Sequence, residues 1–316
     1  MDIEKILNGL TLYENNTKIK KEDQNKFFEF IRHLKSSRKV RFIYRGESNL
    51  NEQYGTDTRN ISLLSQYVFM IGEKSRTFLE NRCEYDNIFK FIWDKFFNKV
   101  CKMNFDSDRT KAKLEQFLAD NSGLNDYFSN KGNRRDFIGN NTRSDKEQKV
   151  ITDYYLALLH TIGKSGNARS HFLSSSTECS VADGFKDENG IILYGWIPRK
   201  GLKDKVISYE GIGECNDLIA SFKLPIYQVP IYPEQKEICL KFGWLPHFII
   251  GFQYQDRFYI NPNALKPWRT EIVYDGLDVD QSGFIEIFNT TNYECFYLFI
   301  DGNYTVIDKG CIRDDC

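Results

Sequence analysis

The sequence predicts an α+β protein with N-terminal and inserted helices and a β-rich second half. Before residue 163, apolar residues recur mostly at the spacing of amphipathic helices. From Ser170 onward, the apolar runs are short or alternating and are separated by Gly, Pro and Asp, as in strands joined by turns. Because 41% of the residues are hydrophobic, the chain has enough apolar material for a core.

The expected helices share an apolar stripe on one face. They cover residues 22–35, 88–100, 109–119 and a segment that begins at Ser144. Ser144 and Glu147 have the spacing of a capping box, in which the two side chains satisfy backbone N–H groups at the start of a helix. Gly163 is a natural end for this last helix.

A segment rich in Asn and Gly, residues 121–141, precedes the last helix and is expected to be a long loop. It carries basic and aromatic side chains, namely Lys131, Arg134, Arg135, Tyr127, Phe128 and Phe137. This mixture suits a polyanionic partner, because bases stack on aromatic rings and phosphates pair with cations. A solvated surface loop is the favoured interpretation, with a polyanion-binding loop as the alternative.

The first expected strand runs from Val40 to Glu47. Later runs with the length and composition of strands lie at 170–176, 190–198, 237–244, 247–255 and 257–262. After Pro262, strand-like pieces are divided by the turn dipeptides Asp275-Gly276 and Asp301-Gly302. We therefore expect one domain over residues 1–262 and a small β-rich C-terminal extension over residues 263–316.

Charge, hydropathy and cysteine pattern exclude several classes of protein. The 43 basic and 44 acidic residues nearly cancel, so no whole-molecule field attracts nucleic acid or an anionic membrane. The charged N-terminus and the lack of an 18-residue apolar run indicate a soluble, cytoplasmic protein with no membrane partner. The eight cysteines form no C-x-x-C pair and are interpreted as reduced packing residues. The histidines lack metal-ligand spacing and are interpreted as structural, so no metal is expected; they are His33, His160, His171 and His247.

Three separated pieces of sequence combine into a candidate site. Arg45 and Gly46 lie near the end of the first strand, the serine run Ser174-Ser175-Ser176 ends a later one, and Gln235 and Glu237 open another. In this order the pieces resemble the motifs of R-S-E class mono-ADP-ribosyltransferases. That family has an arginine on an early strand, a Ser-Thr-Ser strand and a later Gln-x-Glu or Glu-x-Glu.

The middle piece, FLSSSTECSVADGF, carries the most specific part of the resemblance. Like the family, it has a small residue and an aromatic a few positions after the serine run, here Ala182 and Phe185. It differs in having Ser175 where threonine is usual, a change that keeps the hydroxyl. The resemblance covers landmarks from about Val40 to Asn263 and implies an ADP-ribosyltransferase-like split β-sheet core.

The resemblance also implies NAD as co-substrate and assigns roles to the motif residues. Glu237 would accept a hydrogen bond from the ribose 2′-hydroxyl and stabilise the oxocarbenium-like transition state. Ser174 would hold that carboxylate, and Ser174 and Ser176 would contribute to binding the cofactor. Arg45 would grip the pyrophosphate with its guanidinium fork. Gly46 would let backbone groups approach the nicotinamide amide.

Gln235 is the candidate acceptor-binding residue. On a strand, residues 235 and 237 point to the same face, and a neutral amide suits an amide or amine nitrogen better than a guanidinium. Tyr227 and Tyr232 precede it and are expected in an acceptor-facing loop. The Gln-x-Glu subgroup contains Rho-modifying exoenzymes and pierisin-like enzymes, and some bacterial defence toxins of this fold modify RNA.

The main hypothesis is therefore a toxin or defence transferase that moves ADP-ribose from NAD to a nitrogen acceptor. An RNA or DNA base is preferred to a protein asparagine, and an antitoxin protein is an expected partner. Two alternatives stay open: an NAD glycohydrolase that transfers ADP-ribose to water, and a non-catalytic binding module with the same fold.

Overall fold

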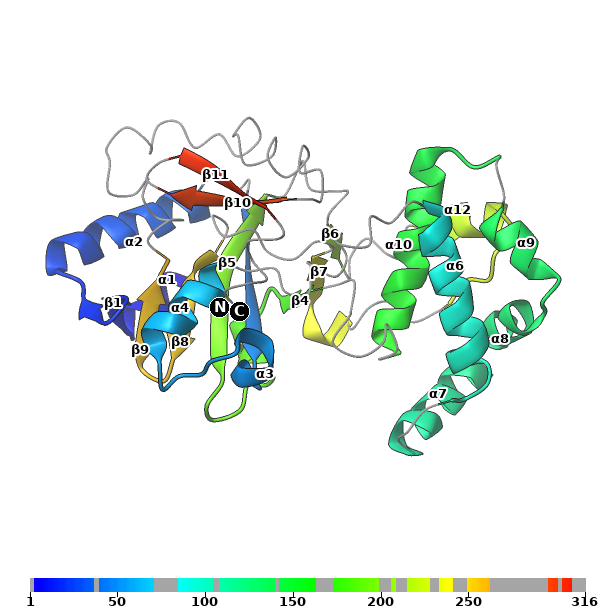
Figure 1. The fold of residues 1–316 in the computed structure, drawn as a ribbon, viewed down its shortest axis with the longest axis horizontal. Coiled ribbons are helices and arrows are strands. Elements are labelled where there is room, and N and C mark those ends of the chain that lie inside the picture. The colour runs from blue at the N-terminus through cyan, green and yellow to red at the C-terminus, as the bar shows by residue number, and fades with distance from the viewer. Residues whose placement is uncertain are drawn as a thin grey trace. The chain divides into compact units, whose positions relative to one another are not determined.

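The computed structural model describes most of the chain up to residue 261 and two strands beyond it. The described residues are 3–36, 40–70, 85–104, 108–139, 142–162, 173–198, 206–208, 215–227, 233–240, 249–261, 295–300 and 303–308. The chain divides into two compact units (Figure 1). The first comprises residues 1–76, 173–206 and 238–316, and the second comprises residues 77–172 and 207–237.

A nine-stranded sheet organises the first unit, in the order β2-β1-β9-β8-β5-β3-β4-β7-β6. The strands are β1 (Thr11–Glu14), β2 (Thr17–Lys18), β3 (Val40–Glu47), β4 (Leu173–Ser176), β5 (Ile191–Pro198), β6 (Val206–Ser208), β7 (Glu237–Leu240), β8 (Ile249–Tyr254) and β9 (Arg257–Ile260). Strands β1 and β9 are parallel, whereas the pairs β1–β2, β8–β9, β5–β8, β3–β5 and β3–β4 are antiparallel. Helices combined with this mostly antiparallel sheet agree with the predicted α+β class.

Strand β5 joins the two halves of the sheet. It pairs with β3 over all its residues and with β8 along its other edge. Its register with β8 shifts between Tyr194 and Gly195, an irregularity of the kind that bends a strand. Residues 191–197 are all buried, which explains why this strand is almost continuously apolar. The described strands up to β9 thus form one continuous sheet, whereas the resemblance implied a split one.

Among the described residues, five helices share the apolar core of the first unit with the sheet. They are α1 (Ile3–Asn8), α2 (Lys21–Ser36), α3 (Leu50–Tyr54), α4 (Ile61–Met70) and α11 (Cys179–Asp183). Helix α2, predicted over residues 22–35, buries Phe27, Ile31 and Leu34 at helical spacing. The Phe27 ring lies 6.2 Å from that of Phe258 on β9, so the amphipathic stripe read from the sequence is the face that packs on the sheet.

Aromatic rings hold the helices of the second unit together. These helices are α6 (Tyr85–Lys95) continued by a π-helical turn (Phe96–Val100), α7 (Asp108–Asp120), α8 (Ser122–Ser129), α9 (Asn133–Ile138), α10 (Asp145–Thr161) and α12 (Asn216–Ser221). Phe96 stacks on Phe128 with centroids 4.3 Å apart, and Phe137 and Tyr155 meet Phe128 edge-on. The helices predicted at 88–100, 109–119 and from Ser144 are confirmed, and the capping box of α10 is present.

The prediction of a long loop over residues 121–141 is wrong. Residues 122–129 and 133–138 form α8 and α9. Phe128 and Phe137 are fully buried, and the Arg143 guanidinium donates to the Phe137 carbonyl oxygen at 2.8 Å, which closes the end of α9. Four of the Asn and Gly residues that suggested a loop flank the helix ends, namely Asn121, Asn130, Gly132 and Gly139. The two phenylalanine rings are therefore core, and a base has no access to them.

Beyond residue 261, the described strands β10 (Cys295–Ile300) and β11 (Asn303–Asp308) pair antiparallel. They match two strand-like pieces of the expected β-rich extension. The domain boundary at residue 262, the end of α10 expected at Gly163 and the two expected turn dipeptides lie outside the described residues. None of the described helices combines the length and the apolar composition that a membrane span requires.

The capping box of α10 gives a first prediction. Replacing Ser144 with Ala removes the hydroxyl that accepts from the Glu147 backbone N–H, so the free energy of unfolding of the second unit falls by about 1 kcal/mol. Chemical denaturation of the full chain measures this loss. Ser122 is exposed in α8, and its replacement by Ala changes stability by less than about 0.5 kcal/mol. Equal effects of the two substitutions would contradict the cap.

Candidate active site

The three strands that carry the sequence motifs are neighbours in the sheet. Arg45 lies on β3, the serine run lies on β4, and Glu237 is the first residue of β7, and these strands follow one another in the order β3-β4-β7. Tyr44 stands opposite Ser176 in the antiparallel pair of β3 and β4. Three pieces far apart in the sequence are thus carried by adjacent strands.

Arg45 is a buried cation with two internal partners. Its side chain is 9% exposed, its Nε is paired with the Glu47 carboxylate, and its Nη1 donates to the Ser174 carbonyl oxygen at 2.6 Å. Arg45 and Glu47 share a face of β3 because they are two residues apart. The pair offsets the cost of burying the guanidinium and fixes its orientation. The other N–H groups of Arg45 make no hydrogen bond within the described residues.

Gly46 has a packing role that differs from the predicted one. A Cβ at this position would overlap the carbonyl oxygen of Ala182 in α11 and would also crowd the backbone of Lys186. The missing side chain therefore lets α11 lie against β3, and the space is already occupied by protein backbone. The contact predicted between backbone groups at Gly46 and the nicotinamide amide stays a prediction.

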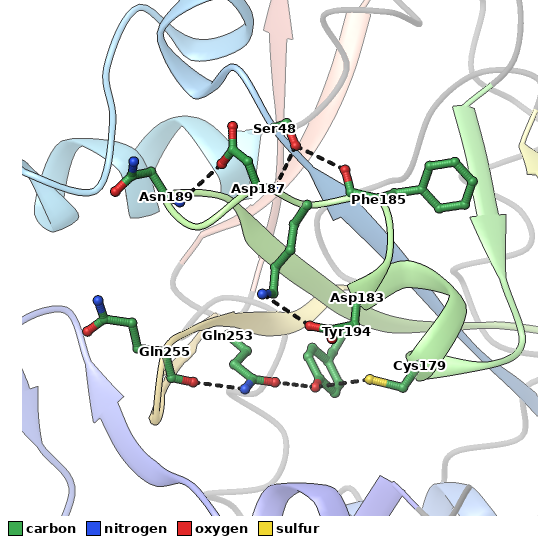
Figure 2. A network of polar contacts seen from close by, with 10 residues as sticks. Ser48, Cys179, Asp183, Phe185, Asp187, Asn189, Tyr194, Gln253 and Gln255 are labelled. Carbon is green, nitrogen blue, oxygen red and sulfur yellow. Dashed lines mark hydrogen bonds and ion pairs between the residues drawn. The ribbon is translucent and has the colours of Figure 1, made fainter.

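Hydrogen bonds fix the turn after α11 against the end of β3 (Figure 2). The Ser48 hydroxyl donates to the Phe185 carbonyl oxygen at 2.9 Å and accepts from the Asp187 backbone N–H at 2.9 Å. Lys186 pairs with Asp183 at 3.1 Å. The Phe185 ring is 57% exposed on this fixed turn, so the aromatic of the family-like middle piece is presented to solvent.

A second set of contacts holds the start of α11 (Figure 2). The Cys179 thiol lies 3.3 Å from the Tyr194 hydroxyl, which donates to the Gln253 side-chain oxygen. Burial raises the pKa of the Cys179 thiol and also that of the Tyr194 hydroxyl, so both groups stay protonated at neutral pH. Cys179 therefore packs α11 onto β5 and is not a thiolate nucleophile.

Two serines of the run make contacts with backbone groups. The buried Ser175 hydroxyl donates to the Ile238 carbonyl oxygen at 2.7 Å, which ties β4 to β7. The Ser176 hydroxyl accepts from the Glu178 backbone N–H at 3.0 Å, at the turn into α11. Ser176 thus ends the strand, and the cofactor contact predicted for it stays a prediction. The contact predicted between the Ser174 hydroxyl and Glu237 stays a prediction.

Glu237 is 1% exposed and is held by a histidine that the sequence analysis dismissed. The Nε2 atom of His160, in the last turn of α10, lies 2.8 Å from Oε1 of Glu237. Because a carboxylate only accepts, the imidazole donates its Nε2–H. No spacing rule along the chain indicates this pair, since the two residues are 77 positions apart.

The start of β7 also gathers the types of atom that bind transition metals. His160, Glu237 and Cys239 each offer one ligand atom, and these atoms lie within 4.8 Å of one another. Among the described residues, this is the one group of three or more such side chains. The spacing of the histidines along the sequence does not detect such a mixed set.

Gln235 does not lie on the strand that the alternation argument required. Residues Pro233–Gln235 form a 3₁₀ turn, and Lys236 has a left-handed backbone with φ of 45°. Strand β7 begins only at Glu237. Pro233 favours the turn because its ring fixes φ, and the left-handed residue breaks the alternation of side chains. The expectation that residues 235 and 237 share one strand face is therefore wrong.

Tyr227, predicted in an acceptor-facing loop, is a buried packing residue. It is 4% exposed, its ring centroid lies 4.5 Å from that of Tyr154, and its backbone N–H donates to the Tyr154 hydroxyl at 3.1 Å. The Tyr155 hydroxyl donates to the Pro225 carbonyl oxygen at 2.6 Å, so α10 holds this whole segment. Tyr232 lies outside the described residues.

Comparison with protein-family models, with curated proteins and with solved structures finds no match for this chain. The functional argument therefore rests on the residues of the site. These offer a fixed guanidinium on β3 and, on a strand of the same sheet, a buried carboxylate with an imidazole partner. A guanidinium held in this way can bind an anionic group, and a buried carboxylate can stabilise positive charge that develops in a transition state.

The packing of Gly46 gives a second prediction. Replacing Gly46 with Ala forces α11 away from β3 and lowers the free energy of unfolding by about 3 kcal/mol. Gly123 is the matched control, because a Cβ there meets no atom within 4 Å, and Ala in α8 stabilises by about 0.5–1 kcal/mol. Chemical denaturation of both variants checks the opposite signs. A neutral Gly46→Ala would show that α11 does not lie against β3.

Proposed function

We propose that this chain is a mono-ADP-ribosyltransferase that uses NAD as co-substrate. The observation that carries the proposal is the adjacency of β3, β4 and β7, which bear the arginine, the serine run and the glutamate of the R-S-E pattern. Unrelated strand ends would not be expected to follow one another in this order.

In the proposed reaction, the bond between ribose C1′ and the nicotinamide nitrogen breaks, and its electron pair leaves with neutral nicotinamide. The acceptor nitrogen attacks C1′ and loses a proton. Positive charge develops on the ribose, and the Glu237 carboxylate stabilises it by accepting a hydrogen bond from the 2′-hydroxyl. A carboxylate that is already buried and oriented stabilises this charge without reorganising water around it.

Arg45 binds the NAD pyrophosphate in this proposal. Its pairing with Glu47 and with the Ser174 carbonyl oxygen holds the guanidinium in one orientation, and its other N–H groups donate to phosphate oxygens. Glu47 weakens the long-range attraction for an anion, so the contribution of Arg45 comes from short, directed hydrogen bonds.

The acceptor is a nitrogen nucleophile, oriented by the Gln235 amide, and we favour an RNA or DNA base. Lys131, Arg134 and Arg135 are exposed in or beside α9 and supply a local basic surface in a chain of net charge −1. Such an activity is that of a toxin or defence enzyme, and an antitoxin protein is the partner that would restrain it. Transfer to a protein asparagine or to water is a separate outcome of the test.

Substitution of Glu237 gives a third prediction. Glu237→Gln keeps the size of the side chain and removes its charge, so turnover of NAD falls by about 100-fold or more. The assay incubates the full chain with labelled NAD, total RNA and cell lysate, and follows released nicotinamide together with label on RNA and on protein. Glu115 is exposed in α7, and Glu115→Gln is expected to retain wild-type turnover.

Each outcome of this assay has a defined meaning. Label on RNA that depends on Glu237 supports transfer to a base. Label on protein alone would indicate that the acceptor is an amide side chain. Free ADP-ribose with no labelled macromolecule shows a glycohydrolase. A wild-type chain that releases no nicotinamide would refute the enzyme and favour a binding module.

Substitution of Arg45 gives a fourth prediction. Arg45→Lys keeps the charge and loses the planar fork, so KM for NAD rises roughly tenfold while kcat changes little. Arg257→Lys, at an exposed position of β9, leaves KM unchanged. Steady-state kinetics with varied NAD separates the two parameters. A fall in kcat at constant KM would show that Arg45 does not contribute to binding NAD.

A further inference from the structure

We propose that His160 is the positioning residue for the Glu237 carboxylate, an inference that rests on the proposed function. The Nε2–Oε1 contact of 2.8 Å is a direct hydrogen bond between a largely buried imidazole and a carboxylate that is almost fully buried. In this arrangement the imidazole donates to Oε1 and does not touch NAD. His160 acts by fixing the carboxylate.

Helix α10 is a suitable platform for this role. It has 17 residues, starts at a complete capping box and buries Tyr154 and Tyr155 on one face. The hydroxyls of these tyrosines bond to the segment 216–227, so the second half of the helix is anchored. His160 lies one turn beyond these anchors. Its backbone is therefore held by contacts that do not involve Glu237.

The hydrogen bond has two physical consequences at Glu237. It compensates part of the cost of removing the carboxylate from water. It also fixes the plane of the carboxylate, and with it the direction in which the oxygens face the ribose hydroxyl. Misplacement of a catalytic group by about 1 Å costs roughly 100-fold in rate, so the loss of this contact is expected to lower kcat.

The test compares two substitutions of His160 in the full chain. His160→Leu removes the donor and introduces an apolar side chain of comparable size, and is expected to lower kcat for NAD cleavage roughly 10- to 100-fold with KM within about twofold. His160→Gln places an amide N–H close to the position of Nε2 and is expected to restore kcat to within about threefold of wild type. The control is Asp153→Asn in the same helix, where the aspartate pairs with Lys149 and the substitution leaves kcat unchanged.

Thermal unfolding and metal content complete the experiment. If both His160 variants are destabilised alike and their folded fractions keep wild-type kcat, His160 is only structural and the inference fails. Stoichiometric zinc in the purified chain, lost in His160→Leu, would also overturn it, because the imidazole would then be a metal ligand.

The two proposals fail in different ways. A wild-type chain that does not cleave NAD refutes the proposed function and this inference with it. A wild-type chain that cleaves NAD, together with a His160→Leu variant of unchanged kcat, refutes the positioning role alone. A kcat that falls in His160→Leu and stays near wild type in His160→Gln supports the positioning role. A residue that only packs would not require a hydrogen-bond donor at this position.

Discussion

The hydrogen bond between His160 and Glu237 orients the buried carboxylate at the first residue of β7. Glu237 ends the second unit and opens β7, and its carboxylate is tolerated in a buried position because a donor meets it there. The next residue, Ile238, accepts from the Ser175 hydroxyl, so the first two residues of β7 are each held by a side chain from elsewhere in the sequence. The Ser175 contact holds β7 to the serine strand, and the His160 contact orients the Glu237 carboxylate.

Three consecutive residues at the end of β3 combine charge pairing on one strand face with close packing on the other. Arg45 and Glu47 share one strand face and neutralise one another, while Gly46 points to the opposite face and admits the backbone of α11. In the sequence Arg-Gly-Glu, the two charged residues are therefore explained by their ion pair, and the glycine is explained by the close approach of α11. The motif match assigns Arg45 and Gly46 to cofactor binding, whereas the contacts show that Gly46 also has a packing role and that Glu47 compensates the charge of Arg45.

Much of the fold could be predicted from the sequence because its signals are local. The stripe of α2, the capping box at Ser144 and the continuous apolar run of β5 are each read within a single segment. Residues 121–141 could not be read in this way, since Phe128 and Phe137 become core only through rings from other helices. Strand alternation gave the wrong geometry for Gln235, because the turn at Pro233–Gln235 and the left-handed Lys236 change the local conformation. His160 had no sequence signal, because its partner is fixed by tertiary structure alone.

Both charged groups of the candidate site carry an internal partner, and this determines how the site can work. Arg45 is paired with Glu47 and Glu237 with His160, so neither side chain loses much conformational freedom when a ligand arrives. The same partners reduce the field that each charge projects into solvent, and the net charge of −1 adds little to it. Capture of a dinucleotide by long-range attraction is therefore weak. For Arg45 the fixed geometry lowers the entropic cost of binding the pyrophosphate, whereas for Glu237 it favours the transition state over the bound ground state and so acts on the rate of the reaction.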